Sequence, residues 1–303
     1  MSRRSIAELR VPQRRFRPDL AKEDAGKNPR FENQTAARQE DAKRAKNLHK
    51  SAETAKVASN AALARELAER LECGLAEDSS AQSLASALYM RDLRIRVGGA
   101  LWKLAEDSCF GAPATFTAIG RGLEIPGRYL SSVDPRAVCA AFRSNLNRAG
   151  AKDATGYLAA FLDGEYERQS DVFRLHFHGL VAGEMRDVLE RLRTTRKYAS
   201  SRDASAGERV VQHIRVSRRV LTNLPDPLTY LLKPFWPCRW EGDINGIQRR
   251  QGYRSRIPEP RHSQLLLWLD RWSLKDMTLL MGLRVGADGL IATKNPYTNG
   301  EGQ

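Results

Sequence analysis

Residues 156–181, GYLAAFLDGEYERQSDVFRLHFHGLV, carry the clearest structural signal in the chain. Two apolar runs flank the polar stretch ERQSD, a pattern that predicts two antiparallel strands joined by a short turn. Alternate residues of a strand share one face of a sheet. His176 and His178 are therefore expected to lie side by side on one face, while Leu175 and Phe177 point into a core.

The segments around this hairpin extend it to a β-α-β-β-α-β-α order. PATFTAIGRGLEIP from position 113 predicts a strand and loop, and ERVVQHIRVSRRVL from position 208 predicts a fourth strand. Asp134 and Pro135 begin a helix that ends at Gly150, EMRDVLERLRTTRKY predicts an amphipathic helix, and Asp226 begins a short helix of about two turns over 228–233. This order predicts an α+β fold, an antiparallel sheet with helices on one face and the other face left for a site.

The flanking regions divide into four parts. Residues 1–34 are predicted to be a disordered basic arm, and 35–110 a helical N-terminal region that is rich in Ala, Glu, Lys and Arg. In that region one helix is expected from 35 to 71 with a stop at Gly74, and a second is expected over 80–107, interrupted near Gly98 and Gly99. The sheet region spans 111–245. A C-terminal helical segment is expected over 246–290, where Ser273 and Asp276 form a capping-box pattern, and a flexible tail over 291–303.

The overall charge favours a polyanionic partner. Lys and Arg outnumber Asp and Glu by 50 to 36, which gives a net charge of +14. Such a balance favours nucleic acid over a membrane surface. The four cysteines are widely spaced and include no CxxC pair, which argues against a disulfide framework or a zinc ribbon and favours the cytoplasm. No apolar run reaches the roughly 20 residues that a membrane span needs.

The hairpin offers a third ligand beside the two histidines. If the turn centres on Gln169 and Ser170, Asp163 lies opposite His176, and a register shift of two residues would put Glu165 there instead. Two imidazoles and one carboxylate can hold a divalent metal, Mg²⁺ or Mn²⁺, with coordination positions open for a phosphate oxygen. The sequence leaves the choice between Asp163 and Glu165 open, with Asp163 preferred. An isolated His-x-His pair is more often structural than metal-binding.

Tyr230 and Lys233 strengthen the case for a catalytic site. They are three residues apart in the predicted short helix, so they are expected to share a face. A tyrosine hydroxyl becomes a useful nucleophile when a metal polarises the electrophile and a nearby cation favours the phenolate. Tyr230 is thus the candidate nucleophile and Lys233 its candidate electrostatic partner.

The strand–HFHGLV–helix–strand–TYLLK order resembles the HUH endonuclease superfamily, in the order found in rolling-circle replication initiators of the single-tyrosine type, over roughly residues 113–240. The resemblance implies an RRM-like sheet on which His176, His178 and a third residue hold the metal. It also implies that Tyr230 attacks a DNA phosphate and becomes linked to its 5′ side, with Lys233 as the motif lysine. The implied substrate is single-stranded or hairpin DNA of a plasmid, phage or mobile element. No GxxxxGK[ST] motif follows, so unwinding would need a partner helicase.

Three basic stretches are candidate DNA contacts. Arginine and lysine there can bind phosphates, and Tyr198 or Tyr253 can stack on an unpaired base. The candidates are Arg196, Lys197, Tyr198, Arg215, Arg218, Arg219, Arg249, Arg250 and Tyr253. Two other interpretations stay open: a non-catalytic nucleic-acid-binding protein with a degenerate core of this type, and a metal-dependent phosphodiesterase in which Tyr230 is only structural.

Overall fold

The structure is a computed structural model. It describes residues 5–9, 34–55, 57–77, 79–106, 109–203, 209–218, 221, 224, 226–233, 235–239, 241–244, 247–250, 255–287 and 289–293, with the backbone alone for 201–203, 209–211, 226, 241–244 and 247–250. In the described part of the chain, no helix is both long enough and apolar enough to cross a membrane.

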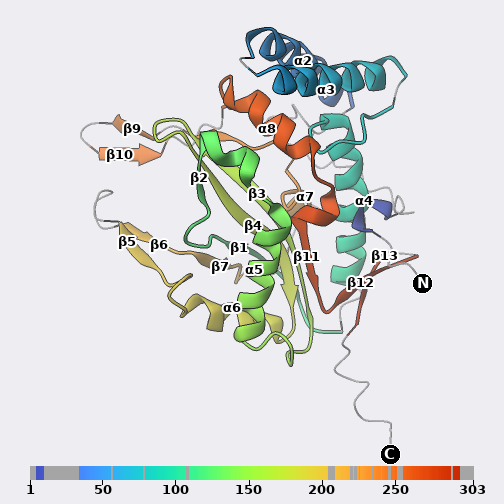
Figure 1. Cartoon of the computed structure of the whole chain (residues 1–303). Helices are drawn as coiled ribbons and strands as arrows, with labels where there is room; N and C mark the ends of the chain where they lie inside the picture. Colours follow the sequence, from blue (N-terminus) through green and yellow to red (C-terminus); the bar gives the residue numbers. More distant parts are fainter. Residues whose placement is uncertain are drawn as a thin grey trace, which may run out of the picture.

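A central, mostly antiparallel sheet organises the chain, as predicted (Figure 1). The strand order is β11-β3-β4-β1-β7, with β2 also pairing with β4 and β8 running parallel beside β3. The strands are β1 (Ala114–Ala118), β2 (Glu124–Pro126), β3 (Tyr157–Glu167), β4 (Val172–Ala182), β7 (Ile214–Val216), β8 (Cys238–Arg239) and β11 (Thr278–Met281). The α+β class and the antiparallel sheet are therefore confirmed.

The β3–β4 hairpin forms in the preferred register. Asp163 pairs with His176, and Phe161 pairs with His178. β1 then pairs with β4 so that Thr117 lies opposite His178 on the other side. The glycine of the HFHG segment is needed here, because a Cβ on Gly179 would meet the Phe116 ring and the Ala159 carbonyl oxygen at 2.4 Å or less.

Two predicted helices cover one face of this sheet. They are α5 (Pro135–Arg148), which Asp134 caps by accepting a hydrogen bond from the Arg136 backbone, and α6 (Met185–Arg193). Phe142 of α5 stacks on Phe177 of β4 with ring centroids 4.4 Å apart. The predicted apolar stripe of α6 is buried, and its members are Met185, Val188, Leu189 and Leu192.

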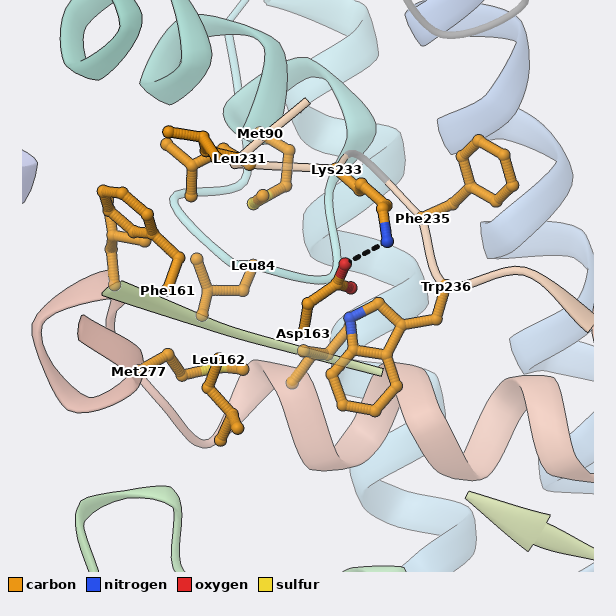
Figure 2. Close-up of a pocket in the computed structure, with 13 residues that line it drawn as sticks. Leu84, Met90, Phe161, Leu162, Asp163, Leu231, Lys233, Phe235, Trp236 and Met277 are labelled. Atoms are coloured by element: carbon orange, nitrogen blue, oxygen red, sulfur yellow. Dashed lines mark ion pairs between the residues drawn. The ribbon is translucent and has the colours of Figure 1, made fainter. Parts of the chain in front are cut away.

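The opposite face, which carries the histidines, is partly covered rather than entirely free. The one-turn helix α7 (Asp226–Thr229) and the chain after it lie over this face, and α4 (Ala87–Glu106) packs against α7. Arg94 of α4 donates two hydrogen bonds to the Thr229 carbonyl, each 3.3 Å long. A small, mostly apolar cavity of ≈ 40 Å³ is lined by residues of β3, by Met90 of α4 and by the chain after α7, among others (Figure 2). The prediction of helices on one face only is therefore wrong.

The N-terminal region is helical but not divided as predicted. The single helix expected over 35–71 is a pair, α2 (Gln34–Thr54) and α3 (Ala58–Ala76), and α3 continues through Gly74. The predicted interruption at Gly98 and Gly99 is absent, because α4 passes through both as buried positions. Within the predicted arm, residues 10–33 lie outside the described residues. The short helix η1 (Ile6–Glu8) instead packs Ile6 into the core at 3% exposure.

The C-terminal region corrects two predictions. The segment 246–290 is not simply helical: α8 (Arg261–Asp270) and the turn η4 (Leu274–Met277) lead into β11, which forms an edge of the central sheet. The core thus extends beyond the predicted limit at 245.

The other strands are β5 (Ser201–Asp203), β6 (Arg209–Val211), β9 (Glu241–Ile244), β10 (Ile247–Arg250), β12 (Leu283–Gly286) and β13 (Gly289–Ala292). The predicted fourth strand is split, with β6 pairing with β5 and β7 joining the central sheet.

Candidate metal centre

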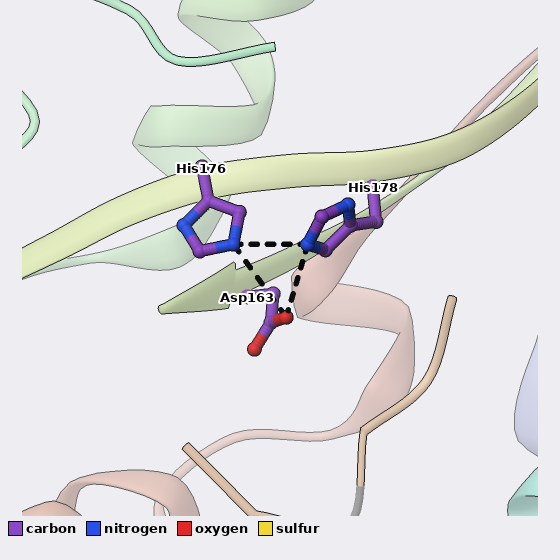
Figure 3. Close-up of side chains that lie close together, drawn as sticks. All are labelled: Asp163, His176 and His178. Atoms are coloured by element: carbon purple, nitrogen blue, oxygen red, sulfur yellow. Dashed lines mark hydrogen bonds and ion pairs between the residues drawn. The ribbon is translucent and has the colours of Figure 1, made fainter. Parts of the chain in front are cut away.

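Asp163, His176 and His178 converge on one point of the sheet (Figure 3). The two imidazole Nε2 atoms are 3.0 Å apart. Asp163 Oδ2 lies 3.7 Å from Nε2 of His176 and 3.5 Å from Nε2 of His178. All three residues are buried, at 4%, 7% and 8% exposure respectively. Strand alternation and the hairpin register are sufficient to bring the three groups together.

Each histidine is oriented through its other ring nitrogen. Nδ1 of His176 donates to the Arg174 carbonyl oxygen at 3.2 Å, which leaves Nε2 as the lone-pair nitrogen. Nδ1 of His178 shares a hydrogen bond of 3.0 Å with the Thr117 hydroxyl. Hydrogen bonds of this kind set the tautomer and the ring direction of metal-binding histidines. Thr117 is a contributor that sequence reasoning missed, because its role depends on the pairing of β1 with β4.

The protonation states suit a metal ligand set. Burial lowers the pKa of His176 below its ordinary value, against the attraction of the nearby Asp163 carboxylate. Burial alone would raise the pKa of Asp163, but the Lys233 ammonium, followed by the two imidazoles, lowers it below its usual value. The environment therefore favours a neutral His176 imidazole and an ionised carboxylate, the forms that bind divalent cations.

The donor spacing fits a divalent metal ion. A metal about 2.1 Å from each of its donors places those donors roughly 3.0–3.4 Å apart. The observed separations of 3.0, 3.5 and 3.7 Å are close to that range. Imidazole and carboxylate groups are both common ligands of divalent metal ions.

Lys233 lies directly against this ligand set. Its ammonium forms an ion pair with Asp163 Oδ2 and is 3.1 Å from His178 Nε2. Figure 2 shows the Asp163–Lys233 pair among the residues that line the small cavity, most of which are apolar, such as Trp236, Met90 and Phe161. An apolar wall lowers the local dielectric constant, which strengthens the attraction between the two charges.

Tyr230 lies beside His178 on the exposed side of the centre. The two rings meet edge to face with centroids 5.2 Å apart, and Tyr230 is 41% exposed. The Lys233 ammonium is 4.8 Å from the Tyr230 ring centroid. The predicted two-turn helix is wrong, since α7 ends at Thr229 and Tyr230 occupies the following turn. The structure nevertheless brings together Tyr230 and Lys233 with both histidines.

Glu165 does not join the group. Although it lies on the same strand face as Asp163, it forms an ion pair with Arg239 of β8. The potential metal ligands that converge are Asp163, His176 and His178. Of the two carboxylates that the sequence left open, the structure therefore brings Asp163 to the histidines.

The predicted DNA-contact residues are distributed unevenly. Arg196, Arg215 and Arg218 are exposed, and Lys197 is half-buried. The prediction that Tyr198 stacks on a base is wrong. Tyr198 is 2% exposed and packs against Phe142, so it has no ring face available for a base. The side chains of Arg219, Arg249, Arg250 and Tyr253 lie outside the described residues.

The comparisons with known proteins found no match for this chain. No family model matches the chain, and neither a curated protein nor a solved structure shows a significant match.

Proposed function

We propose that the chain is a metal-dependent nicking and strand-transfer enzyme for single-stranded DNA that acts through a 5′-phosphotyrosine at Tyr230. One observation carries the proposal: the ring of Tyr230, which is distant in sequence, packs against His178 of the buried Asp163–His176–His178 group. The centroid of that ring is 4.8 Å from the Lys233 ammonium. A hydroxyl nucleophile, a cation and a metal ligand set are the parts that phosphoryl transfer to tyrosine requires.

In the proposed reaction, His176, His178 and Asp163 would hold Mn²⁺ or Mg²⁺. A metal ion held by these residues would supply Lewis-acid polarisation of the scissile phosphate. The Tyr230 oxygen forms a bond to phosphorus while the bond from phosphorus to the 3′ oxygen breaks. The phenol proton passes to solvent, and the departing oxygen takes up a proton to become a free 3′-OH. Lys233 stabilises the negative charge on the phenolate and on the phosphate during attack.

The resemblance to rolling-circle initiators points to the biological process in which such an enzyme would act, the initiation of DNA replication. A nick that leaves a free 3′-OH can prime replication, and the phosphotyrosine conserves the energy of the broken bond for resealing. We propose replication initiation for a plasmid, phage or mobile element, with a separate helicase to unwind the duplex. The net charge of +14 supports a nucleic-acid substrate.

A non-catalytic DNA-binding protein is the second candidate, and one contact favours it. The Lys233 ammonium already pairs with Asp163 and approaches His178 Nε2, so the buried carboxylate is neutralised without a metal ion. A protein that had lost catalytic activity could keep a stable sheet, because the Lys233 ammonium neutralises the buried Asp163 carboxylate. Titration with Mn²⁺ separates the candidates, because the enzyme requires saturable binding that His176→Ala removes.

The decisive experiment maps a covalent adduct. Wild-type protein with Mn²⁺ is incubated with labelled single-stranded oligonucleotides that include hairpin-forming sequences, followed by denaturing electrophoresis and mass spectrometry of the linked peptide. Tyr230→Phe removes only the hydroxyl oxygen, so we expect loss of adduct and of cleavage, by at least about 10³-fold, with an unchanged melting temperature.

Tyr129→Phe is the matched control, because Tyr129 is also exposed, at 50%. It should give the wild-type amount of adduct. An adduct on any tyrosine other than Tyr230 would contradict the assignment, and cleavage without an adduct in the wild type would support a hydrolytic phosphodiesterase instead.

A further inference from the structure

An open groove runs from His178 to the edge strand β7. It has a volume of ≈ 340 Å³, within the range of about 300–1,000 Å³ that small-ligand sites occupy. The side chains that line it include Thr115 and Thr117 of β1, Arg215 of β7, Ser217, and Tyr230 from the turn after α7. The groove therefore begins at the candidate metal centre and ends at a cation.

The sheet register places these groups on one line. Thr117 pairs with His178 on one side and with Arg215 on the other. Residues directly opposite each other in antiparallel strands share a face, so Arg215 points to the same side as His178. Its neighbour Ile214 points to the other side and is 1% exposed in the core. Two strand spacings, about 10 Å, separate the backbones at Arg215 and His178.

Arg215 is available to bind an anion. It is exposed, and it forms no ion pair with the residues that the structure describes. The described residues that line the groove include hydroxyl groups but no carboxylate. An arginine in such a setting favours a phosphate, which its guanidinium can bind through two hydrogen bonds.

We propose that this groove binds one nucleotide of an unpaired DNA strand, with one phosphate at the Asp163–His176–His178 centre and the adjacent phosphate on Arg215. This proposal rests on the proposed function and identifies how the substrate lies across the site. Thr117 lies between the two ends, and Thr115 and Ser217 line the groove two residues further along, on the same face of the sheet. A single phosphate can satisfy only one end of the groove, whereas a nucleotide with a phosphate at each end satisfies both.

The test uses thymidine 3′,5′-bisphosphate, thymidine 5′-monophosphate and inorganic phosphate, titrated calorimetrically into the full chain with Mn²⁺. We expect wild type to bind the bisphosphate at least about tenfold more tightly than the monophosphate, because two anchors act together. Arg215→Gln should remove that advantage, and Arg215→Lys should restore part of it. Arg143→Gln on α5 removes the same charge from the opposite face and should leave the affinities within twofold.

The outcomes separate this proposal from the nuclease proposal. Equal binding of bisphosphate and monophosphate by wild type would overturn the groove assignment, as would an Arg215→Gln protein with wild-type affinities. If the protein still cleaves DNA when either of these results is obtained, the nuclease proposal is not affected. If Arg215→Gln removes the affinity advantage of the bisphosphate but the wild-type protein forms no DNA adduct, the groove is supported as a nucleotide site. Phosphotyrosine chemistry is then rejected.

Discussion

Lys233 places a positive charge where a metal ion would be bound. Its ammonium contacts Asp163 Oδ2 and His178 Nε2, two of the three prospective ligand atoms, and its side chain is only 10% exposed. A divalent cation and an ammonium group compete for the same carboxylate, and their mutual repulsion is strong where water is largely excluded. Metal binding should therefore require Lys233 to move away from Asp163.

The corresponding prediction concerns Lys233→Met, which keeps a long apolar side chain and removes the charge. We expect Mn²⁺ to bind about tenfold more tightly, because the competing cation is lost. Adduct formation should nevertheless fall, since the phenolate and phosphate lose their cationic partner. Calorimetric Mn²⁺ titration measures the first effect, with Lys275→Met at an exposed position as the control. Weaker Mn²⁺ binding by Lys233→Met would show that the lysine supports the metal site rather than competing for it.

The sequence predicts the ligand set well because the relevant contacts are local. His176, His178 and Asp163 are joined by strand alternation and one tight turn, both of which are visible in the sequence. Tyr198 was misassigned because a tyrosine in a basic stretch looks the same whether it is buried or exposed. Glu165 could not be excluded, because its partner Arg239 comes from a distant strand.

At the level of elements, α7 is too short to fix its own position. A single helical turn has little stability in isolation, so packing must hold it. Arg94 of α4 supplies two hydrogen bonds to the Thr229 carbonyl, directly before Tyr230 in the chain. α4 is itself held by Asp41 of α2, which accepts hydrogen bonds from the backbone of Ala87 and Leu88 at the start of α4. The N-terminal helices thus support the turn that carries the candidate nucleophile.

We therefore predict that Arg94→Met slows adduct formation without weakening Mn²⁺ binding. The Thr229 carbonyl loses a buried donor, at a cost of about 1–3 kcal/mol in folding free energy, and Tyr230 is less firmly positioned. The single-turnover rate should fall about tenfold at saturating DNA, and Arg94→Lys should recover part of it. Arg96→Met, a half-buried arginine on the same helix, should retain the wild-type rate. An unchanged rate in Arg94→Met would exclude a positioning role.

The sequence predicts helices and strands correctly where the element itself contains a clear capping or hydrophobic pattern. α5 has a capping aspartate followed by proline, and β3 and β4 are long apolar strands. β11 and β13 were missed because four-residue strands have too little pattern to identify. The unbroken α4 shows tertiary packing overriding the low helix propensity of Gly98 and Gly99.

At the level of the whole molecule, the positive charge is unevenly distributed along the sequence. Residues 10–33 contain seven arginines and lysines but only four carboxylates. The preceding segment is part of the fold, because Ile6 and Leu9 are each 3% exposed in the main core. Deleting the whole N-terminus would therefore remove core contacts together with charge, and substitution is the cleaner way to test the basic segment.

We predict that replacing Arg10, Arg14, Arg15, Arg17, Lys22, Lys27 and Arg30 with glutamine weakens DNA binding without changing where DNA is cut. Each basic residue that contacts a phosphate of a single strand releases about 0.7 of a counterion, so the dependence of log K on log salt should become shallower. Affinity for a labelled oligonucleotide, measured by fluorescence anisotropy from 50 to about 300 mM salt, gives the slope. Glutamine replacement of the four carboxylates in the same segment is the control and should steepen the slope or leave it unchanged. If the seven-residue variant keeps the wild-type slope, the basic segment does not contact the DNA backbone, and the affinity arises from the folded part of the chain.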